Sequence, residues 1–149
     1  MATRRLGIVM YGVTGRMGLN QHLVRSIVAI RAQGGVLLPN GDRVMPDPIL
    51  VGRNAEKVAA LAKQYGIERS TADLDAALKN PADEVFFDAA TTQMRADLLT
   101  QAIEAGKHVY CEKPIADTSA IDAGSSSSRS LLRKKSIPIR PSRPLRAFA

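Results

Sequence analysis

A turn with three evenly spaced glycines, Gly12-Val-Thr-Gly15-Arg-Met-Gly18, constrains the fold of this chain more than any other feature. Before it lies a short apolar run over residues 6–11, which is typical of a strand buried on both faces. After it we expect a helix over residues 16–32. Its apolar side chains share one helical face: Leu19, Leu23, Ile27 and Ile30. A strand, a glycine turn and an amphipathic helix in this order predict the start of a parallel sheet covered by helices.

Strand-like and helix-like segments alternate beyond this turn. The apolar runs predict further strands over residues 49–51, 68–71, 84–88 and 108–111. The helical patterns cover residues 54–65, 73–79 and 94–105. Residues 33–48 are rich in glycine and proline and are expected to form a loop, with a small hairpin turning at Asn40-Gly41 as the alternative. The alternation predicts an α/β fold, a Rossmann-like doubly wound parallel sheet with helices on both faces.

The glycine turn (residues 12–18) is a variant of the dinucleotide-binding fingerprint. Glycines allow a tight turn and let backbone N–H groups approach a pyrophosphate at a helix N-terminus. We therefore expect the whole turn to bind a dinucleotide cofactor through Gly12, Val13, Thr14, Gly15, Arg16, Met17 and Gly18. The alternative is a tight turn without a ligand.

The end of the second expected strand bears on the choice between NAD and NADP. An NAD site usually places an acidic residue there, on the ribose hydroxyls. This chain has Gly52-Arg53-Asn54 instead. Arg53 is suited to a 2′-phosphate and Asn54 to the ribose, so the sequence favours NADP slightly, with NAD as the alternative. Arg53 as a solvated arginine at a helix start remains open.

Two segments after later strands are candidates for the nicotinamide end. Ala90 and Thr91 follow the strand over residues 84–88, and their small side chains suit a backbone that passes under the nicotinamide ribose. Lys113, between Glu112 and Pro114, follows the strand over residues 108–111. It is the candidate catalytic residue, because its ammonium group can donate to a substrate hydroxyl or carbonyl oxygen. The alternative is a surface lysine paired with Glu112.

Other polar and reactive residues are expected to be structural. Asp88 is expected to cap a turn, while His22 in a helix and His108 at a strand start are expected to have structural roles. The single cysteine, Cys111, is expected to be a buried, inert thiol in an apolar strand. No metal-ligand cluster is recognisable.

The net charge of +7 is unevenly distributed. Residues 1–116 hold 14 Lys and Arg against 12 Asp and Glu, whereas residues 117–149 hold 7 against 2. The second segment contains a run of four serines at 125–128 and is rich in proline and arginine. We expect residues 1–116 to form an NAD(P)-binding domain and residues 117–149 to be a low-complexity, disordered tail. Nucleic acid is therefore not expected as the main partner, and without a long apolar run we expect a cytoplasmic protein without membrane contact.

The segment Ala105-Gly-Lys-His-Val-Tyr-Cys-Glu-Lys-Pro-Ile-Ala116 resembles the Ala-Gly-Lys-His-Val-x-x-Glu-Lys-Pro signature of the Gfo/Idh/MocA oxidoreductases, the glucose–fructose oxidoreductase and inositol dehydrogenase family. The resemblance implies NAD(P)-dependent oxidation or reduction of a sugar, polyol or related compound. It assigns cofactor binding to Gly12, Gly15, Gly18, Arg53 and Asn54, and a cofactor- and substrate-facing role to Glu112, Lys113 and Pro114. The segment over residues 90–95 lacks the proline and histidine of the family pattern.

The resemblance also implies a second, substrate-binding domain, which is not recognisable in this sequence. We therefore expect the cofactor-binding half of an oxidoreductase, truncated and inactive alone, with self-association through an uncovered strand over residues 108–111. Three alternatives stay open. One is a stand-alone NAD(P)-binding or sensor module with a partner-docking tail, and another is a nucleic-acid binder acting through the basic tail. The third is an enzyme like the dihydrodipicolinate reductases, which Gly15-Arg-Met-Gly18 also resembles.

Overall fold

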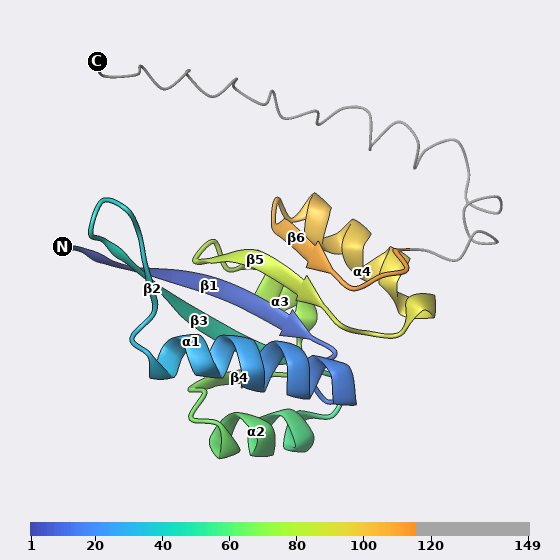
Figure 1. Ribbon diagram of the computed structural model, residues 1–149. Coiled ribbons are helices and arrows are strands. Elements are labelled where there is room, and N and C mark those ends of the chain that lie inside the picture. Colours follow the sequence, from blue (N-terminus) through green and yellow to red (C-terminus); the bar gives the residue numbers. More distant parts are fainter. Residues whose placement is uncertain (116–149) are drawn as a thin grey trace. The chain divides into compact units, whose positions relative to one another are not determined.

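A six-stranded sheet with helices on both faces forms the part of the chain that the computed structural model describes, residues 1–115 (Figure 1). The strands are β1 (Thr3–Tyr11), β2 (Val36–Leu37), β3 (Arg43–Val51), β4 (Arg69–Thr71), β5 (Asp83–Asp88) and β6 (His108–Cys111). The helices are η1 (Gly18–Val28), α1 (Ala29–Ala32), α2 (Ala55–Gln64), α3 (Leu74–Lys79) and α4 (Thr92–Glu104). The α/β prediction is therefore confirmed. The expected disordered tail over residues 117–149 lies outside the described residues.

Strand β1 lies in the middle of the sheet, parallel to β3 on one side and to β5 on the other. The chain first builds outward from β1 through β3 to β4, and then crosses to the other side for β5 and β6. The direction of winding thus changes between β1 and β5. In open α/β sheets, ligands bind outside the carboxyl ends of the strands at such a switch point.

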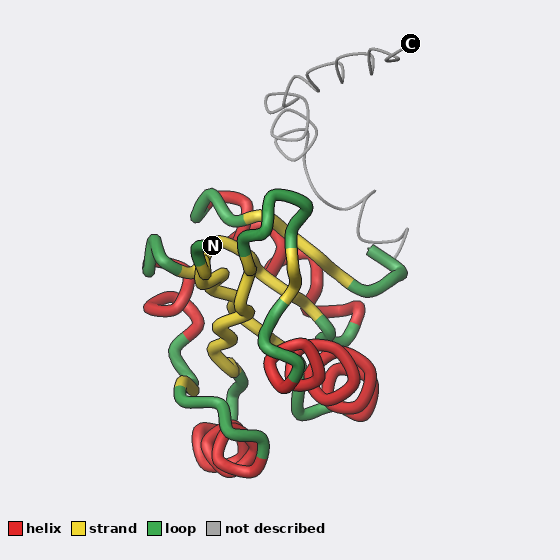
Figure 2. Tube along the Cα trace, turned by 60° about the vertical axis from the view of Figure 1, so that its left-hand side comes forward, coloured by secondary structure: helices red, strands yellow, loops and turns green. Residues whose placement is uncertain are grey.

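Two hydrophobic clusters, one on each face, hold the helices to the sheet. On one face, Leu23 of η1 and Val58 of α2 pack with Met10 of β1. On the other face, Leu98 of α4 packs with Val9 of β1, together with residues of α3. Figure 2 shows the strands inside and the helices around them. None of the helices in residues 1–115 is both long and apolar enough to cross a bilayer.

The expectation of a loop over residues 33–48 is wrong in part, because a hairpin forms there. Strand β2 pairs antiparallel with the start of β3, and the chain turns between them at 38–42, as the hairpin alternative predicted. The prolines Pro46 and Pro48 lie within β3 and suggested a loop. On the side of β3 away from β1, β2 pairs with residues 43–44 and β4 with residues 49–51. The prolines fall in the gap between them, where a missing N–H group removes no ladder bond.

The predicted helix over residues 16–32 is present, but its middle is a π-helix, η1. Leu23 is fully buried, whereas Leu19 and Ile27 are partly buried against the same cluster. Wide π-helical turns are rare and are often found at functional sites.

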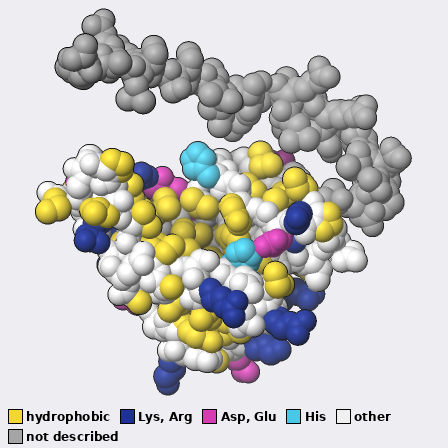
Figure 3. Space-filling model, viewed as in Figure 1, with side chains coloured by type: hydrophobic (Ala, Val, Ile, Leu, Met, Phe, Trp, Pro, Cys, Tyr) yellow, Lys and Arg dark blue, Asp and Glu magenta, His cyan; other side chains and the backbone are white. Residues whose placement is uncertain are grey.

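Strand β6 is more exposed than the sequence predicted. Tyr110 is 59% exposed and Val109 37%, and Cys111 is half-buried rather than buried. Two features explain this difference: within residues 1–115, β6 pairs with a strand on one side only, and a groove lined by Ser26, Ile27 and Tyr110 lies between most of η1 and this strand. Figure 3 shows a patch of hydrophobic side chains on this face of the molecule. The apolar pattern predicted the strand correctly, but its burial depends on what packs over it.

Candidate functional site

The carboxyl ends of four parallel strands lie side by side, in register, along one end of the sheet. Tyr11 of β1 is opposite Val51 of β3 and Asp88 of β5, and Asp88 is opposite Cys111 of β6. The residues that follow these strands therefore lie along one edge. These residues are the glycine turn, Arg53 and Asn54, Ala90 and Thr91, and the segment 112–114, here called the lysine turn. All the segments that the sequence singled out as a site are thus brought to the same edge.

The glycine turn packs closely against the loop after β5. Gly12 has a φ of +85°, and a Cβ atom on it would lie 2.5 Å from the backbone of Ala89. Gly18 is buried, and its Cβ would lie 2.5 Å from the carbonyl oxygen of Gly12. Both positions therefore require glycine for packing. At Gly15, which is exposed, the nearest atom to an added Cβ is 3.4 Å away, so the protein itself leaves room there.

The rest of the glycine turn is open to solvent except at one residue. Thr14, Arg16 and Met17 are exposed, while the Val13 side chain is fully buried in the core, so only its backbone can face a ligand. The helix begins at Arg16, two residues before η1, and no side chain at Met17 caps it. The uncapped first turn of a helix presents backbone N–H groups and a partial positive charge, which suits a phosphate.

The segment after β3 lies next to the glycine turn. A Cβ atom on Gly52 would be 4.0 Å from the methyl carbon of Thr14. Arg53 is exposed and makes no ion pair with residues 1–115. The Asn54 side-chain oxygen accepts from the Lys57 N–H at 2.9 Å and caps α2. Its amide group remains available as a donor.

The loop after β5 is built on a buried ion pair. Asp88 and Arg95 are 0% and 3% exposed, and Arg95 Nε donates to Asp88 Oδ2 at 2.6 Å. Asp88 Oδ1 also accepts from the Ala90 N–H at 2.8 Å, which confirms the predicted turn cap. Ala90 is half-buried and Thr91 is the exposed N-cap of α4. The loop backbone is therefore held against the Gly12 backbone.

Arg95 also reaches the lysine turn, a role that the sequence reasoning missed. Its guanidinium donates to the carbonyl oxygen of Ala90 at 2.6 Å and to that of Pro114 at 2.5 Å. A signal was present, because Arg95 shares a helical face with Leu98 and Ala102, the buried face of α4. An arginine on the buried side of a helix requires buried acceptors. The arginine at this position thus connects the loop after β5 with the lysine turn.

The lysine turn is held from the other face of the sheet by His22. The His22 Nε2 atom makes a short contact with Glu112 Oε1, which the sequence reasoning also missed. The Glu112 N–H donates to the carbonyl oxygen of Asp88 at 3.1 Å. Lys113 and Pro114 are exposed, and Lys113 makes no ion pair within residues 1–115. Glu112 is therefore engaged with His22 and not with Lys113.

A doubly wound parallel sheet with a glycine turn at its switch point defines the dinucleotide-binding class of α/β folds. The model of the Gfo/Idh/MocA oxidoreductase family, NAD-binding Rossmann fold, matches residues 44–125. The chain belongs to this family and forms its NAD-binding Rossmann domain, which confirms the first resemblance.

Curated relatives and a solved structure agree with this assignment. The chain is 46% identical over 111 residues to the D-xylose dehydrogenase of Paenarthrobacter nicotinovorans, covering 74% of this chain and 29% of that protein. It is 36% identical over 70 residues to the levoglucosan dehydrogenase of Pseudarthrobacter phenanthrenivorans, covering 47% of this chain and 18% of that protein. A solved levoglucosan dehydrogenase in complex with NADH and levoglucosan has a TM-score of 0.67 at 26% identity, covering 89% of this chain and 33% of that chain. The chain thus spans about a third or less of the length of these proteins.

Proposed function

We propose that this chain is the cofactor-binding part of a dehydrogenase that interconverts a hydroxyl and a carbonyl group on a sugar or related polyol. The observation that carries the proposal is the common edge where four strands end in register. Support for the substrate class comes from relatives named for carbohydrates: D-xylose dehydrogenase, levoglucosan dehydrogenase and 1,5-anhydro-D-fructose reductase.

The glycine turn would hold the pyrophosphate of the cofactor. Gly12 and Gly18 are needed for packing, whereas a Cβ atom on Gly15 would only touch the Gly12 carbonyl oxygen, at 3.4 Å. A glycine without a packing requirement is expected where a ligand approaches the backbone closely. The helix begins at Arg16, ahead of η1, and its first backbone N–H groups add donors at the same place.

The adenosine end would lie beside Arg53 and Asn54. The guanidinium of Arg53 is free to meet a 2′-phosphate, and the Asn54 amide to donate to the ribose. Because β3 is followed directly by Gly52, Arg53 and Asn54, without an acidic residue to accept from a ribose 2′-hydroxyl, we favour NADP over NAD.

The nicotinamide end would lie between Ala90–Thr91 and the lysine turn. The cofactor supplies hydride transfer when bound. Lys113, exposed and without an ion-pair partner in the described chain, would donate a hydrogen bond to the reacting oxygen of the substrate and hold its proton. Glu112 and Pro114 would position it.

A fluorescence titration of the full chain with NADPH and NADH tests the proposal. Saturable binding of NADPH, with NADH weaker, is expected for the wild type. Gly15→Ala should weaken binding about tenfold or more without lowering the melting temperature, because the added methyl group meets the ligand and not the protein. Absence of binding by a folded wild type, or an unchanged affinity in Gly15→Ala, would contradict the proposal.

A further inference from the structure

We propose that His22 is a positioning residue for the nicotinamide end of the site, acting through Glu112 on the lysine turn. The proposal rests on the proposed function, since it assigns a role within the same site. Neither the glycine turn nor the lysine turn includes His22. It lies on η1, the helix that begins at the glycine turn, and its side chain reaches across to the end of β6.

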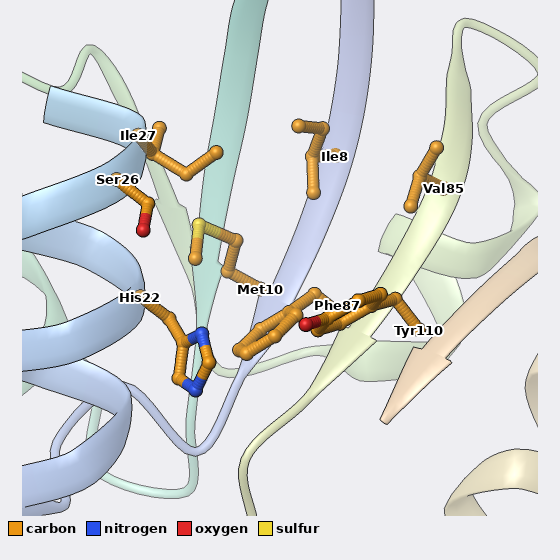
Figure 4. Close-up of a pocket in the computed structure, with 8 residues that line it drawn as sticks. All are labelled: Ile8, Met10, His22, Ser26, Ile27, Val85, Phe87 and Tyr110. Carbon is orange, nitrogen blue, oxygen red and sulfur yellow. The ribbon is translucent and has the colours of Figure 1, made fainter. Parts of the chain in front are cut away.

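The surroundings of His22 fix its ring in one place. The ring centroid lies 4.7 Å from that of Phe87 and 6.4 Å from that of Tyr110, and Phe87 and Tyr110 are themselves stacked at 5.4 Å. Figure 4 shows the imidazole pointing from the helix toward Phe87, at one end of a groove of about 260 Å³. The His22 side chain is 17% exposed and the Glu112 side chain 30%. The contact is thus shielded, and packing aims its donor at Glu112.

The lysine turn is held at both of its outer residues and not at its centre. His22 engages the carboxylate of Glu112 from the face covered by η1. Arg95, on the face covered by α4, donates to the carbonyl oxygen of Pro114. Lys113 between them is exposed. This arrangement fixes the backbone of the turn while leaving the ammonium group free for a substrate.

The helix that carries His22 also explains why the contact matters for the cofactor. Gly18, where η1 begins, is packed on the Gly12 carbonyl, so η1 lies in direct contact with the glycine turn. Strands β1, β5 and β6 already hold the two turns side by side, and the His22–Glu112 contact adds a direct link between the helix of the pyrophosphate site and the residue before Lys113. A catalytic group must be held within a fraction of an ångström of its productive position to be effective.

The test compares two ligands of the full chain: NADPH, and 2′-phospho-ADP-ribose, which lacks the nicotinamide. His22→Phe keeps an aromatic ring against Phe87 but removes the donor. We expect it to weaken NADPH binding about fivefold and to leave 2′-phospho-ADP-ribose binding unchanged. His22→Gln, which keeps a donor, should restore most of the NADPH affinity. His108→Phe, at the exposed start of β6, is the matched control and should change neither.

Glu112→Ala changes a half-exposed side chain and serves if His22→Phe does not fold. It should weaken NADPH binding to the same extent and leave 2′-phospho-ADP-ribose binding unchanged. The double variant, His22→Phe with Glu112→Ala, should bind NADPH no more weakly than either single variant, because the same interaction is removed in all three. Equal losses of affinity for both ligands would mean that His22 has only a structural role, and would overturn the inference. Additive losses in the double variant, or no loss of NADPH affinity in the single variants, would overturn it as well. If the wild type binds both 2′-phospho-ADP-ribose and NADPH, the proposed function is not affected by the results for the His22 and Glu112 variants. If it binds neither, both proposals fall.

Discussion

Arg95 and Asp88 form an ion pair that is almost completely removed from solvent, with 2.6 Å between Nε and Oδ2, at the point where β5 ends. The pair holds the loop that packs on the glycine turn, and through Pro114 it also holds the lysine turn. One helix residue therefore supports two of the four segments of the proposed site.

Removing Arg95 should destabilise the whole domain. Arg95→Ala leaves the Asp88 carboxylate buried without its partner, which typically costs about 3–5 kcal/mol of unfolding free energy. Urea denaturation should report the loss. Arg25→Ala is the matched control, because Arg25 is exposed and bonds only Gln21 within the described residues, and it should change stability by less than about 0.5 kcal/mol. Equal stability of the two variants would contradict the structural role of the pair.

The second buried carboxylate should affect stability without affecting ligand binding. Asp83 is 0% exposed and accepts from Arg69 at 2.7 Å and 3.0 Å, at the amino end of β5. The hydrogen bond to Asp83 is the main cause that raises the pKa of Arg69, so this guanidinium stays charged at any working pH. Asp83→Ala should lose about 1–3 kcal/mol, because the Arg69 that it leaves is partly exposed and keeps its contacts with Asp47. NADPH affinity measured well below the midpoint temperature should not change, because the site is at the opposite edge.

Glycine replacements should separate packing from ligand contact. Gly12→Ala forces a methyl group to within 2.5 Å of the Ala89 backbone at a φ of +85°, and should cost about 2 kcal/mol or more. Gly15→Ala meets no such obstacle and should melt like the wild type. Thermal melts of the two variants in the absence of ligand are the measurement. A large drop for Gly15→Ala would mean that this glycine, too, is needed for packing.

Arg53→Ala should discriminate between the two cofactors. We expect NADPH affinity to fall about tenfold and NADH affinity to stay the same, since only NADPH carries the 2′-phosphate. Fluorescence titrations at constant ionic strength measure both. Lys57→Ala, one turn into α2, removes a nearby positive charge and controls for a general electrostatic effect. Parallel losses for NADPH and NADH would refute the preference for NADP.

Strand β6 should mediate concentration-dependent self-association. Within residues 1–115 its outer edge is unpaired, and this edge and the exposed Val109 and Tyr110 are suited to pairing with another strand. A charge on an edge strand opposes such pairing, so Val109→Lys should reduce the associated fraction in sedimentation velocity experiments. An unassociated wild type at high concentration would contradict this expectation.

Much of the site was predictable because local patterns carry it. The patterns at 6–11, 84–88 and 94–105 predicted strands and a helix, and the glycine turn and Lys113 were recognised as segments that follow strands. The two contacts that hold the lysine turn could not be predicted. His22 and Glu112 are 90 residues apart in the sequence, and Arg95 and Pro114 are 19 residues apart. Such contacts depend on strand order, which a single sequence does not specify.

The sequence by itself determined the alternation of strands and helices, the glycine-bearing turn and the family signature at 105–116, because each depends on neighbours along the chain. Only the tertiary structure decided which turns lie together and how exposed β6 is. It also decided that Glu112 and Pro114, on either side of Lys113, are held from opposite faces of the sheet. The physical reason is that burial and buried hydrogen bonds depend on which elements pack together. Residues far apart along the chain make that packing.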